Sequence, residues 1–268
     1  MKNLTILFFL LLSIFSFSQY KLTYDYTYYY DSLRPSKVYN YEMEVIKTST
    51  DRFYFEKNTF KSMEVDYLSW KNKENVQLTW EKMNQIPYSK LNKFIISNDF
   101  REFRFIEIGL NDIMSTLLFN SINWKIESNV IKDVKFKKAT ANFLGRNWIA
   151  YYDENIPIND GPFIFSGLPG LILEIHDEQN YFKWKLTSYK LDYNDNNYTM
   201  NLLNHKIQKF SNISEIDFKK IMKEDFLNPI TAIESTEYQI DEEKSKQIIE
   251  FQKTKKYRFL IPDLWTYL

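Results

Sequence analysis

Apolar and polar residues alternate one by one along much of this chain. The clearest case begins after residue 19, where aromatic or aliphatic residues occupy every second position: Tyr20, Leu22, Tyr24, Tyr26, Tyr28 and Tyr30. A period of two in residue types that favour sheets predicts a β-strand with one face in the core. Residues 39–45 repeat the pattern after a turn around residues 31–36, so the two segments are predicted to form a hairpin.

The alternation continues through the first half of the chain. Further strands are predicted around Phe53 and Phe55, around Val65, Tyr67 and Trp70, around Val76, Leu78 and Trp80, around Phe103 and Phe105, and around Ile122, Trp124 and Ile126. One apolar and one polar face is typical of an antiparallel sheet with a wetted side, whereas parallel strands are continuous apolar runs. We therefore predict a long antiparallel meander, interrupted at residues 109–120 by a short helix capped by Asn111 or Asp112.

The second half adds strands and then changes to helical patterns. Residues 148–152, 171–176 and 180–190 have the pattern of strands, and residues 191–204 that of a loop or edge segment. Residues 214–229, with Ser214 as cap and Pro229 just past the end, and residues 241–255 are predicted helices. The predicted fold class is mainly β: a long curved antiparallel sheet or partly open barrel with a few helices, mostly C-terminal.

The first eighteen residues predict an exported protein. They read MKNLTILFFLLLSIFSFS, with Lys2 as the only charge, and are typical of a signal peptide cleaved before Gln19. An uncleaved membrane anchor is the alternative, although the apolar run falls short of the ~20 residues that a helical span needs. We expect residues 19–268 to form a single domain in the periplasm, the cell envelope or the medium, without a membrane span.

Composition narrows the kinds of partner. Lys plus Arg and Asp plus Glu number 35 each, so the total charge gives no electrostatic reason to expect nucleic acid or an anionic membrane surface as the main partner. The chain has no cysteine, so the fold is expected to depend on its core without disulfides. Aromatic residues make up 18% of the chain. At strand spacing they are core residues in the first interpretation and the rim of a groove for an apolar ligand in the second.

Residues suited to catalysis are sparse. Of the two histidines, only His176 has acidic neighbours, Glu174 and Asp177, and these three do not complete a metal site. Ser166 does not lie in the turn motif of serine hydrolases, and no phosphate-binding or dinucleotide-binding loop is present. No metal and no cofactor is predicted.

Glycine and proline residues are concentrated in one stretch of the chain. Residues 157–170 contain Pro157, Gly161, Pro162, Gly167, Pro169 and Gly170, although the whole chain has only 5 glycines and 7 prolines. We predict two successive chain reversals, with Gly161 at positive φ in the first and residues 167–170 forming the second. The stretch is either a rigid corner of the sheet or the lip of a binding groove, and Gly167→Val is expected to abolish soluble protein.

This stretch resembles a known family. The motif GLPGLI consists of Gly167, Leu168, Pro169, Gly170, Leu171 and Ile172, and it follows Gly161 and Pro162. Further matching positions are Lys138, Ala139, Thr140, Gly145, Arg146, Trp148, Ala150 and Pro157. The chain is similar here to the GLPGLI family of exported proteins from Bacteroidetes. It departs from the family pattern at Tyr151, where tryptophan is usual, and at Lys137, where cysteine is frequent. Members are largely of unknown function, so the resemblance implies no catalytic residue.

The predicted function is that of a non-enzymatic binding or accessory protein. Its ligand would be apolar or peptide-like, or its partner an outer-membrane protein. The alternative is an envelope hydrolase that uses carboxylates or the cluster of Glu174, His176 and Asp177. A third class is a purely structural envelope component. An enzyme gathers ionisable groups in one concave pocket, whereas a carrier has an apolar groove rimmed by tyrosine.

Overall fold

A computed structural model describes residues 19–29, 38–89, 91, 93–107, 112–127, 136–208, 210–227 and 242–253 of the chain. The predicted signal peptide, the turn around residues 31–36, and Tyr30, Asn111 and Pro229 lie outside these ranges. Within them no helix is both long enough and apolar enough to cross a membrane.

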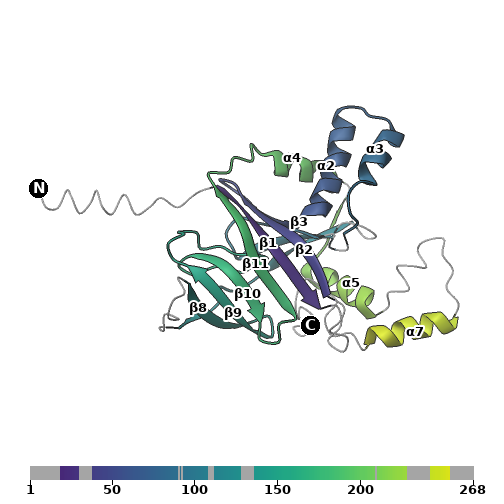
Figure 1. Ribbon diagram of the computed structural model, residues 1–268. Helices are drawn as coiled ribbons and strands as arrows, with labels where there is room; N and C mark the ends of the chain where they lie inside the picture. Colours follow the sequence, from purple (N-terminus) through teal and green to yellow (C-terminus); the bar gives the residue numbers. More distant parts are fainter. Residues whose placement is uncertain are drawn as a thin grey trace, which may run out of the picture.

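A single sheet of twelve strands dominates the described part of the chain (Figure 1). Its strands are β1 (Tyr20–Tyr29), β2 (Val38–Lys47), β3 (Arg52–Glu56), β4 (Lys93–Ser97), β5 (Glu102–Glu107), β6 (Ile113–Leu118), β7 (Lys125–Ile126), β8 (Lys137–Phe143), β9 (Arg146–Asp153), β10 (Leu171–Asp177), β11 (Phe182–Leu191) and β12 (Ser211–Asn212). Their order across the sheet is β12-β6-β5-β4-β3-β2-β1-β11-β10-β9-β8-β7, and each pair is antiparallel except β12 with β6. The predicted fold class, a long antiparallel sheet with few helices, is confirmed.

The helices of the described ranges are α2 (Lys57–Lys71), α3 (Val76–Met83), α4 (Tyr198–Ile207), α5 (Glu215–Leu227) and α7 (Glu242–Lys253). Two of them, α2 and α3, lie where strands were predicted. The predicted strands around Val65 to Trp70 and Val76 to Trp80 are therefore wrong. Local capping favours the helices, because the Glu56 carboxylate accepts hydrogen bonds from the N–H groups of Asn58 and Thr59. The Asn75 side chain accepts one from Leu78 in the same way.

Two further segments differ from the prediction. Residues 113–118 form strand β6 rather than a helix, because Ile113, Ser115 and Leu117 alternate into the core. The second part of the predicted loop at residues 191–204 belongs to α4, whose first turn is held by hydrogen bonds from Thr199 to the Asp195 carboxylate. The C-terminal helices are confirmed, and Ser214 caps α5 by accepting a hydrogen bond from the Asp217 N–H at 3.1 Å.

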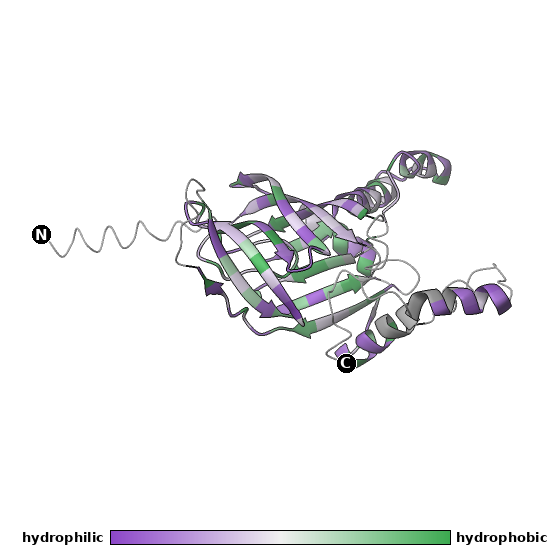
Figure 2. Ribbon diagram, turned by 60° about the horizontal axis from the view of Figure 1, so that its bottom comes forward, coloured by the Kyte–Doolittle hydropathy of each residue, from purple (hydrophilic) through white to green (hydrophobic). Residues whose placement is uncertain are grey.

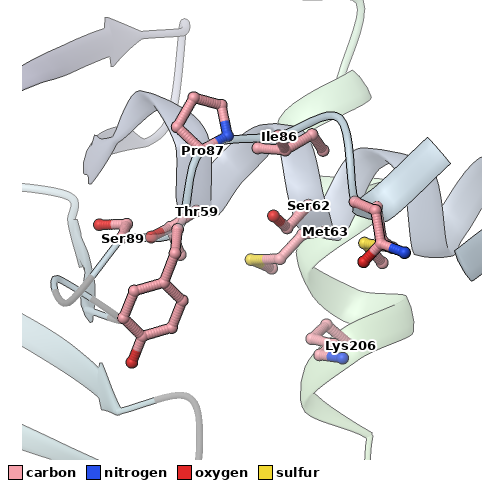
Figure 3. A pocket seen from close by; sticks show the side chains of 10 residues that line it. Thr59, Ser62, Met63, Ile86, Pro87, Ser89 and Lys206 are labelled. Carbon is pink, nitrogen blue, oxygen red and sulfur yellow. The ribbon is translucent and has the colours of Figure 1, made fainter. Parts of the chain in front are cut away.

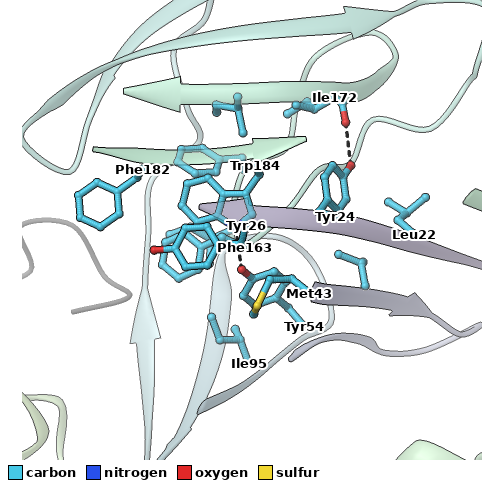
Figure 4. Packing of buried hydrophobic residues seen from close by; sticks show 14 of the residues in the cluster. Leu22, Tyr24, Tyr26, Met43, Tyr54, Ile95, Phe163, Ile172, Phe182 and Trp184 are labelled. Atoms are coloured by element: carbon cyan, nitrogen blue, oxygen red, sulfur yellow. Dashed lines mark hydrogen bonds between the residues drawn. The ribbon is translucent and has the colours of Figure 1, made fainter. Parts of the chain in front are cut away.

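The sheet carries a core on each face. The inner face holds the larger one, built around side chains such as Tyr24, Tyr26, Tyr54, Phe163 and Trp184 (Figure 4). The tyrosines of β1 from Tyr20 to Tyr28 that point inward are at most 6% exposed, which confirms their interpretation as core residues.

The outer face holds the second core. There Phe53 and Phe55 of β3 pack with Met63 of α2 and Leu202 and Leu203 of α4. All five residues of β3 are buried, because both faces of that strand are covered. Figure 2 shows α2 and α3 projecting to one side of the sheet.

Candidate functional site

The glycine- and proline-rich stretch lies against the inner face of the sheet. Phe163, Phe165 and Leu168 are at most 1% exposed and belong to the inner core. The stretch is closed on itself by a bridge between Asp160 and Ser166 and by a hydrogen bond from the Gly167 N–H to the Asn159 carbonyl. The Tyr24 hydroxyl of β1 donates to the Ile172 carbonyl at 2.7 Å (Figure 4). The chain itself therefore fills the space that a ligand would need over this part of the inner face.

A buried ion pair fixes this stretch to β3. The Arg52 Nε donates to both carboxylate oxygens of Asp160 at 2.9 Å, and the two side chains are 1% and 0% exposed. The two other guanidinium nitrogens donate to the carbonyls of Phe163 and Gly161 at 2.8 and 2.6 Å. Asp160 also accepts from the Tyr20 hydroxyl at 2.8 Å.

The protonation states of this cluster follow from its surroundings. Burial by itself lowers the pKa of Arg52, but the Asp160 carboxylate more than offsets it, so the pKa is raised and the guanidinium stays charged. Burial and the negative charge of Asp160 both raise the pKa of Tyr20, so its hydroxyl stays protonated. With its donors and acceptors used internally, the cluster holds the stretch in place and offers no group to a substrate.

Most motif residues lie inside the molecule. Gly161, Pro162, Leu168, Gly170, Leu171 and Ile172 are buried, whereas Gly167, Pro169 and Pro157 are exposed. The expected positive φ at Gly161 is wrong, since Phe163 takes that conformation instead, with φ of 54°. Gly167 has φ of 90°. A Cβ on Gly170 would lie 2.1 Å from the Asp153 carbonyl oxygen, so only glycine fits where the chain approaches β9.

The other family-matching positions divide between core and surface. Ala139, Trp148 and Ala150 are fully buried in the inner core. Gly145 lies in the two-residue turn that joins β8 to β9. Lys138 and Thr140 of β8 line a polar groove of about 490 Å³ on the other face, together with Asn123, Lys125, Asn142 and Asn147.

The candidate hydrolytic cluster is not brought together. Asp177 points inward and pairs with Arg146 at 2.9 Å, the two side chains being 0% and 5% exposed. Burial raises the pKa of Asp177, while the N–H of Phe182 and the charge of Arg146 oppose this. Glu174 pairs instead with Lys183 at 2.6 Å. The His176 ring stacks on Tyr151 with centroids 6.3 Å apart. Within the described ranges, no three histidine or acidic side chains are arranged to hold a metal ion.

An apolar cleft lies on the opposite side of the sheet, where α2 and the loop after α3 meet the distant helix α4 (Figure 3). It has a volume of about 680 Å³. The cleft is lined by Thr59, Ser62 and Met63 of α2, by Met83 of α3, by Asn84 and residues 86–89 of the following loop, and by Lys206 of α4. Sequence reasoning missed this cleft because it assigned residues 65–80 to strands. The spacing of Phe60, Met63, Tyr67 and Trp70 at intervals of three and four was the available helical signal.

Four polar side chains that line the cleft form hydrogen bonds or an ion pair within the chain. The Thr59 hydroxyl donates to the Leu91 carbonyl at 2.8 Å, and the Ser62 hydroxyl donates to the Asn58 carbonyl at 3.0 Å. The Ser89 hydroxyl accepts a hydrogen bond from the Leu91 N–H at 3.0 Å. Lys206, the one cation of the lining, pairs with Asp66 at 3.1 Å. The arrangement offers an apolar wall in an open cleft, and its lining residues include no acid and no histidine.

Comparisons with known proteins give a partial family match. Residues 113–174 match the family model described as "Protein of unknown function (Porph_ging)". The Porph_ging match contains the whole GLPGLI motif, Gly167–Ile172, and Asp160, the residue that anchors the stretch. The cleft lies outside the matched range.

Two solved structures share a low level of similarity with the chain. One is titled "Structure of PNGF-II in P21 space group", with 14% identity, a TM-score of 0.48, and coverage of 77% of this chain and 33% of that one. The other, "Structure of PNGF-II in C2 space group", has 15% identity, a TM-score of 0.46, and coverage of 76% and 32%. The chain thus spans about a third of the length of these structures. No curated protein matches it.

Proposed function

We propose that this protein is a non-enzymatic binding or accessory protein whose cleft between α2, residues 84–89 and α4 holds an apolar or peptide-like ligand. The observation that supports this most directly is the lining of the cleft, in which Met63, Met83, Ile86, Pro87 and Tyr88 provide an apolar wall. Its volume of about 680 Å³ falls in the range of small-molecule sites, about 300–1,000 Å³.

Methionine side chains suit a ligand of variable shape. They are unbranched and polarizable, so they adapt to irregular apolar surfaces at little cost. Tyr88 is 82% exposed at the rim and presents a ring with a polar hydroxyl, which suits the boundary between apolar ligand and water. Lys206 stands beside this wall, where a carboxylate of a fatty acid or peptide would compete with Asp66 for the ammonium group.

The hydrolase alternative has less support. Glu174 pairs with Lys183, and neither Glu174 nor His176 shares the inward direction of Asp177. The ion pairs of Arg52 with Asp160 and of Arg146 with Asp177 are buried in the core. An active site needs its ionisable groups in a concave space open to substrate. We further propose, from residues 1–18, that the protein acts after export in the periplasm or cell envelope.

Native mass spectrometry of the protein purified from its own envelope fraction tests this proposal. We expect a bound apolar molecule, and we expect the purified chain to bind cis-parinaric acid with a rise in melting temperature. Ile86→Glu should abolish binding, because it places a charge against the apolar wall. Ile126→Glu, at an exposed site far along the chain, is the matched control. An empty wild-type protein without any thermal shift, or equal binding by the Ile86→Glu variant, would refute the assignment of the cleft.

A further inference from the structure

The helical hairpin of α2 and α3 exposes an unusual amount of apolar surface. Among the described residues, six of the twelve large apolar side chains that are exposed belong to this hairpin or its following loop: Leu68, Trp70, Val76, Leu78, Trp80 and Tyr88. Trp70 and Trp80 are each 63% exposed, and Val76 is 73% exposed. Scattered single residues of this kind are ordinary on a protein surface, but half of them on one short hairpin and its loop, with two tryptophans included, mark a surface that contacts something apolar.

Five of these residues flank the turn at residues 72–75, and we name them the hairpin tip: Leu68, Trp70, Val76, Leu78 and Trp80. We propose that the hairpin tip docks into a lipid surface that carries anionic headgroups. The proposal concerns a surface separate from the cleft and does not depend on the proposed ligand.

The shape of the tip favours a lipid surface over a protein face. A stable protein interface buries about 800 Å² on each partner over a broad patch. The tip is instead the narrow end of two short helices that project away from the sheet (Figures 1 and 2). At a rise of about 1.5 Å per residue, the apolar positions of α3 lie within about two turns of the tip. This depth matches the ~5–10 Å to which amphipathic elements enter the headgroup region. Tryptophan is the residue most typical of that region.

The charges near the turn are complementary to anionic lipid. Lys73 is exposed in the turn, and Lys71, the last residue of α2, is exposed beside it. Glu74, the acidic residue nearest to them, pairs with Lys82 at 2.6 Å and accepts a hydrogen bond from Ser69. Its charge is therefore balanced within the hairpin. Two lysines beside apolar side chains that enter the interface add a favourable attraction to anionic headgroups.

Aromatic contacts with α4 hold the α2 side of the hairpin in place, whereas α3 has no buried residue. The Trp70 ring packs on His205 of α4 with centroids 4.3 Å apart, and Tyr67 lies 5.5 Å from the same histidine ring. None of the eight residues of α3, all of them described, is buried. Isolated helices this short are marginal in water, so a surface that covers Val76 and Trp80 would also stabilise α3.

Co-sedimentation of the purified mature chain with vesicles tests the proposal. We expect wild type to pellet with vesicles of phosphatidylcholine and phosphatidylglycerol, and its tryptophan emission to shift to shorter wavelength. Replacing Trp70, Val76 and Trp80 together by serine should lower the partition coefficient at least about tenfold, since one such buried side chain is worth a factor of ten or more. The matched control, Leu118→Ser with Ile216→Ser, changes side chains that are 70% and 78% exposed elsewhere and should keep wild-type binding.

Charge variants measure the electrostatic contribution to vesicle binding, and a cleft variant shows whether the cleft contributes to it. Lys71→Glu with Lys73→Glu should reduce binding to the anionic vesicles several-fold and leave the weaker binding to pure phosphatidylcholine unchanged. Ile86→Glu should bind vesicles like wild type, which keeps this test apart from that of the cleft. The proposal is overturned if wild type stays in the supernatant or the serine variant binds equally. It is also overturned if light scattering shows a dimer that the serine variant loses while neither protein binds vesicles.

Discussion

The inner stretch of residues 157–172 is mostly buried, whereas the α2–α3 hairpin exposes large apolar side chains to solvent. The inner stretch contains three of the five glycines, yet most of its side chains are buried and its one acidic group is neutralised by Arg52. The hairpin, residues 57–83, contains neither glycine nor proline, yet it presents two tryptophans to solvent. The residues of the GLPGLI motif and the exposed apolar residues of the hairpin are thus on different faces of the molecule.

A dense and specific motif can therefore reflect the requirements of packing alone. Gly170 is required where two backbones approach, and Asp160 is required to hold Arg52. Neither contact needs a ligand. Exposed apolar residues, by contrast, cost solubility and contribute nothing to the core, so their concentration on one hairpin indicates contact outside the chain.

The largest effect is expected from Gly170→Val. The new Cβ would lie 2.1 Å from the Asp153 carbonyl oxygen and 2.8 Å from the Glu154 Cα, which are backbone atoms that cannot rotate away. We expect loss of soluble protein, or destabilisation above about 4 kcal/mol in urea unfolding. Gly167→Ala is the matched control: its Cβ meets nothing within 4 Å, so only the φ of 90° causes strain, about 1–3 kcal/mol. A soluble Gly170→Val protein with normal stability would contradict the corner interpretation.

The next effect is expected from Arg52→Met. Removing the guanidinium leaves Asp160 charged and buried and withdraws donors from the Phe163 and Gly161 carbonyls. Breaking a buried pair from one side costs about 3–5 kcal/mol. Arg52→Met combined with Asp160→Leu should recover part of that loss, because no buried charge then remains. Lys183→Met, which breaks a surface pair with Glu174, should cost at most about 1 kcal/mol. Equal effects of the buried and surface variants in urea unfolding would show that Arg52 does not anchor the stretch.

A smaller effect concerns pH. Burial raises the folded-state pKa of Asp177 above its unfolded value, so the stability that Asp177 contributes is fully present below the unfolded pKa. It is lost as the pH rises through the folded pKa. The free energy of unfolding of wild type minus that of Asp177→Asn should therefore be larger at pH 4 than at pH 7.

Asp99 gives a control of opposite sign. Hydrogen bonds from the N–H groups of Glu102 and Arg101 lower its pKa, so its contribution is present above the unfolded pKa and lost as the pH falls. The corresponding difference for Asp99→Asn should shrink towards acid pH. If both differences moved in the same direction with pH, burial would not be the dominant influence on Asp177.

Burial also explains which parts of the fold could be predicted from the sequence. The strands β1, β2 and β5 were predictable because the apolar residues that each of them contributes to the inner core recur with a period of two. The same rule failed at Val76, Leu78 and Trp80. Their alternation resembles that of a strand, but all three are exposed on a helix, so the assumption that apolar residues mark a core does not apply to them. The ion pair of Arg52 with Asp160 and the cleft around Met63 join segments distant in sequence, which no local pattern reports.

The smallest effect on stability is expected at the hairpin tip. Val76→Ser and Trp80→Ser should each change the free energy of unfolding by less than about 0.5 kcal/mol, because both side chains are already in water in the free protein. Phe163→Ser is the contrasting change in the inner stretch. That ring is 0% exposed, and its loss should cost at least about 3 kcal/mol through the cavity that it leaves. Urea unfolding without vesicles measures both. A large loss of stability from Val76→Ser or Trp80→Ser would mean that the tip packs within its own chain, and the surface assigned to lipid would then belong to the fold.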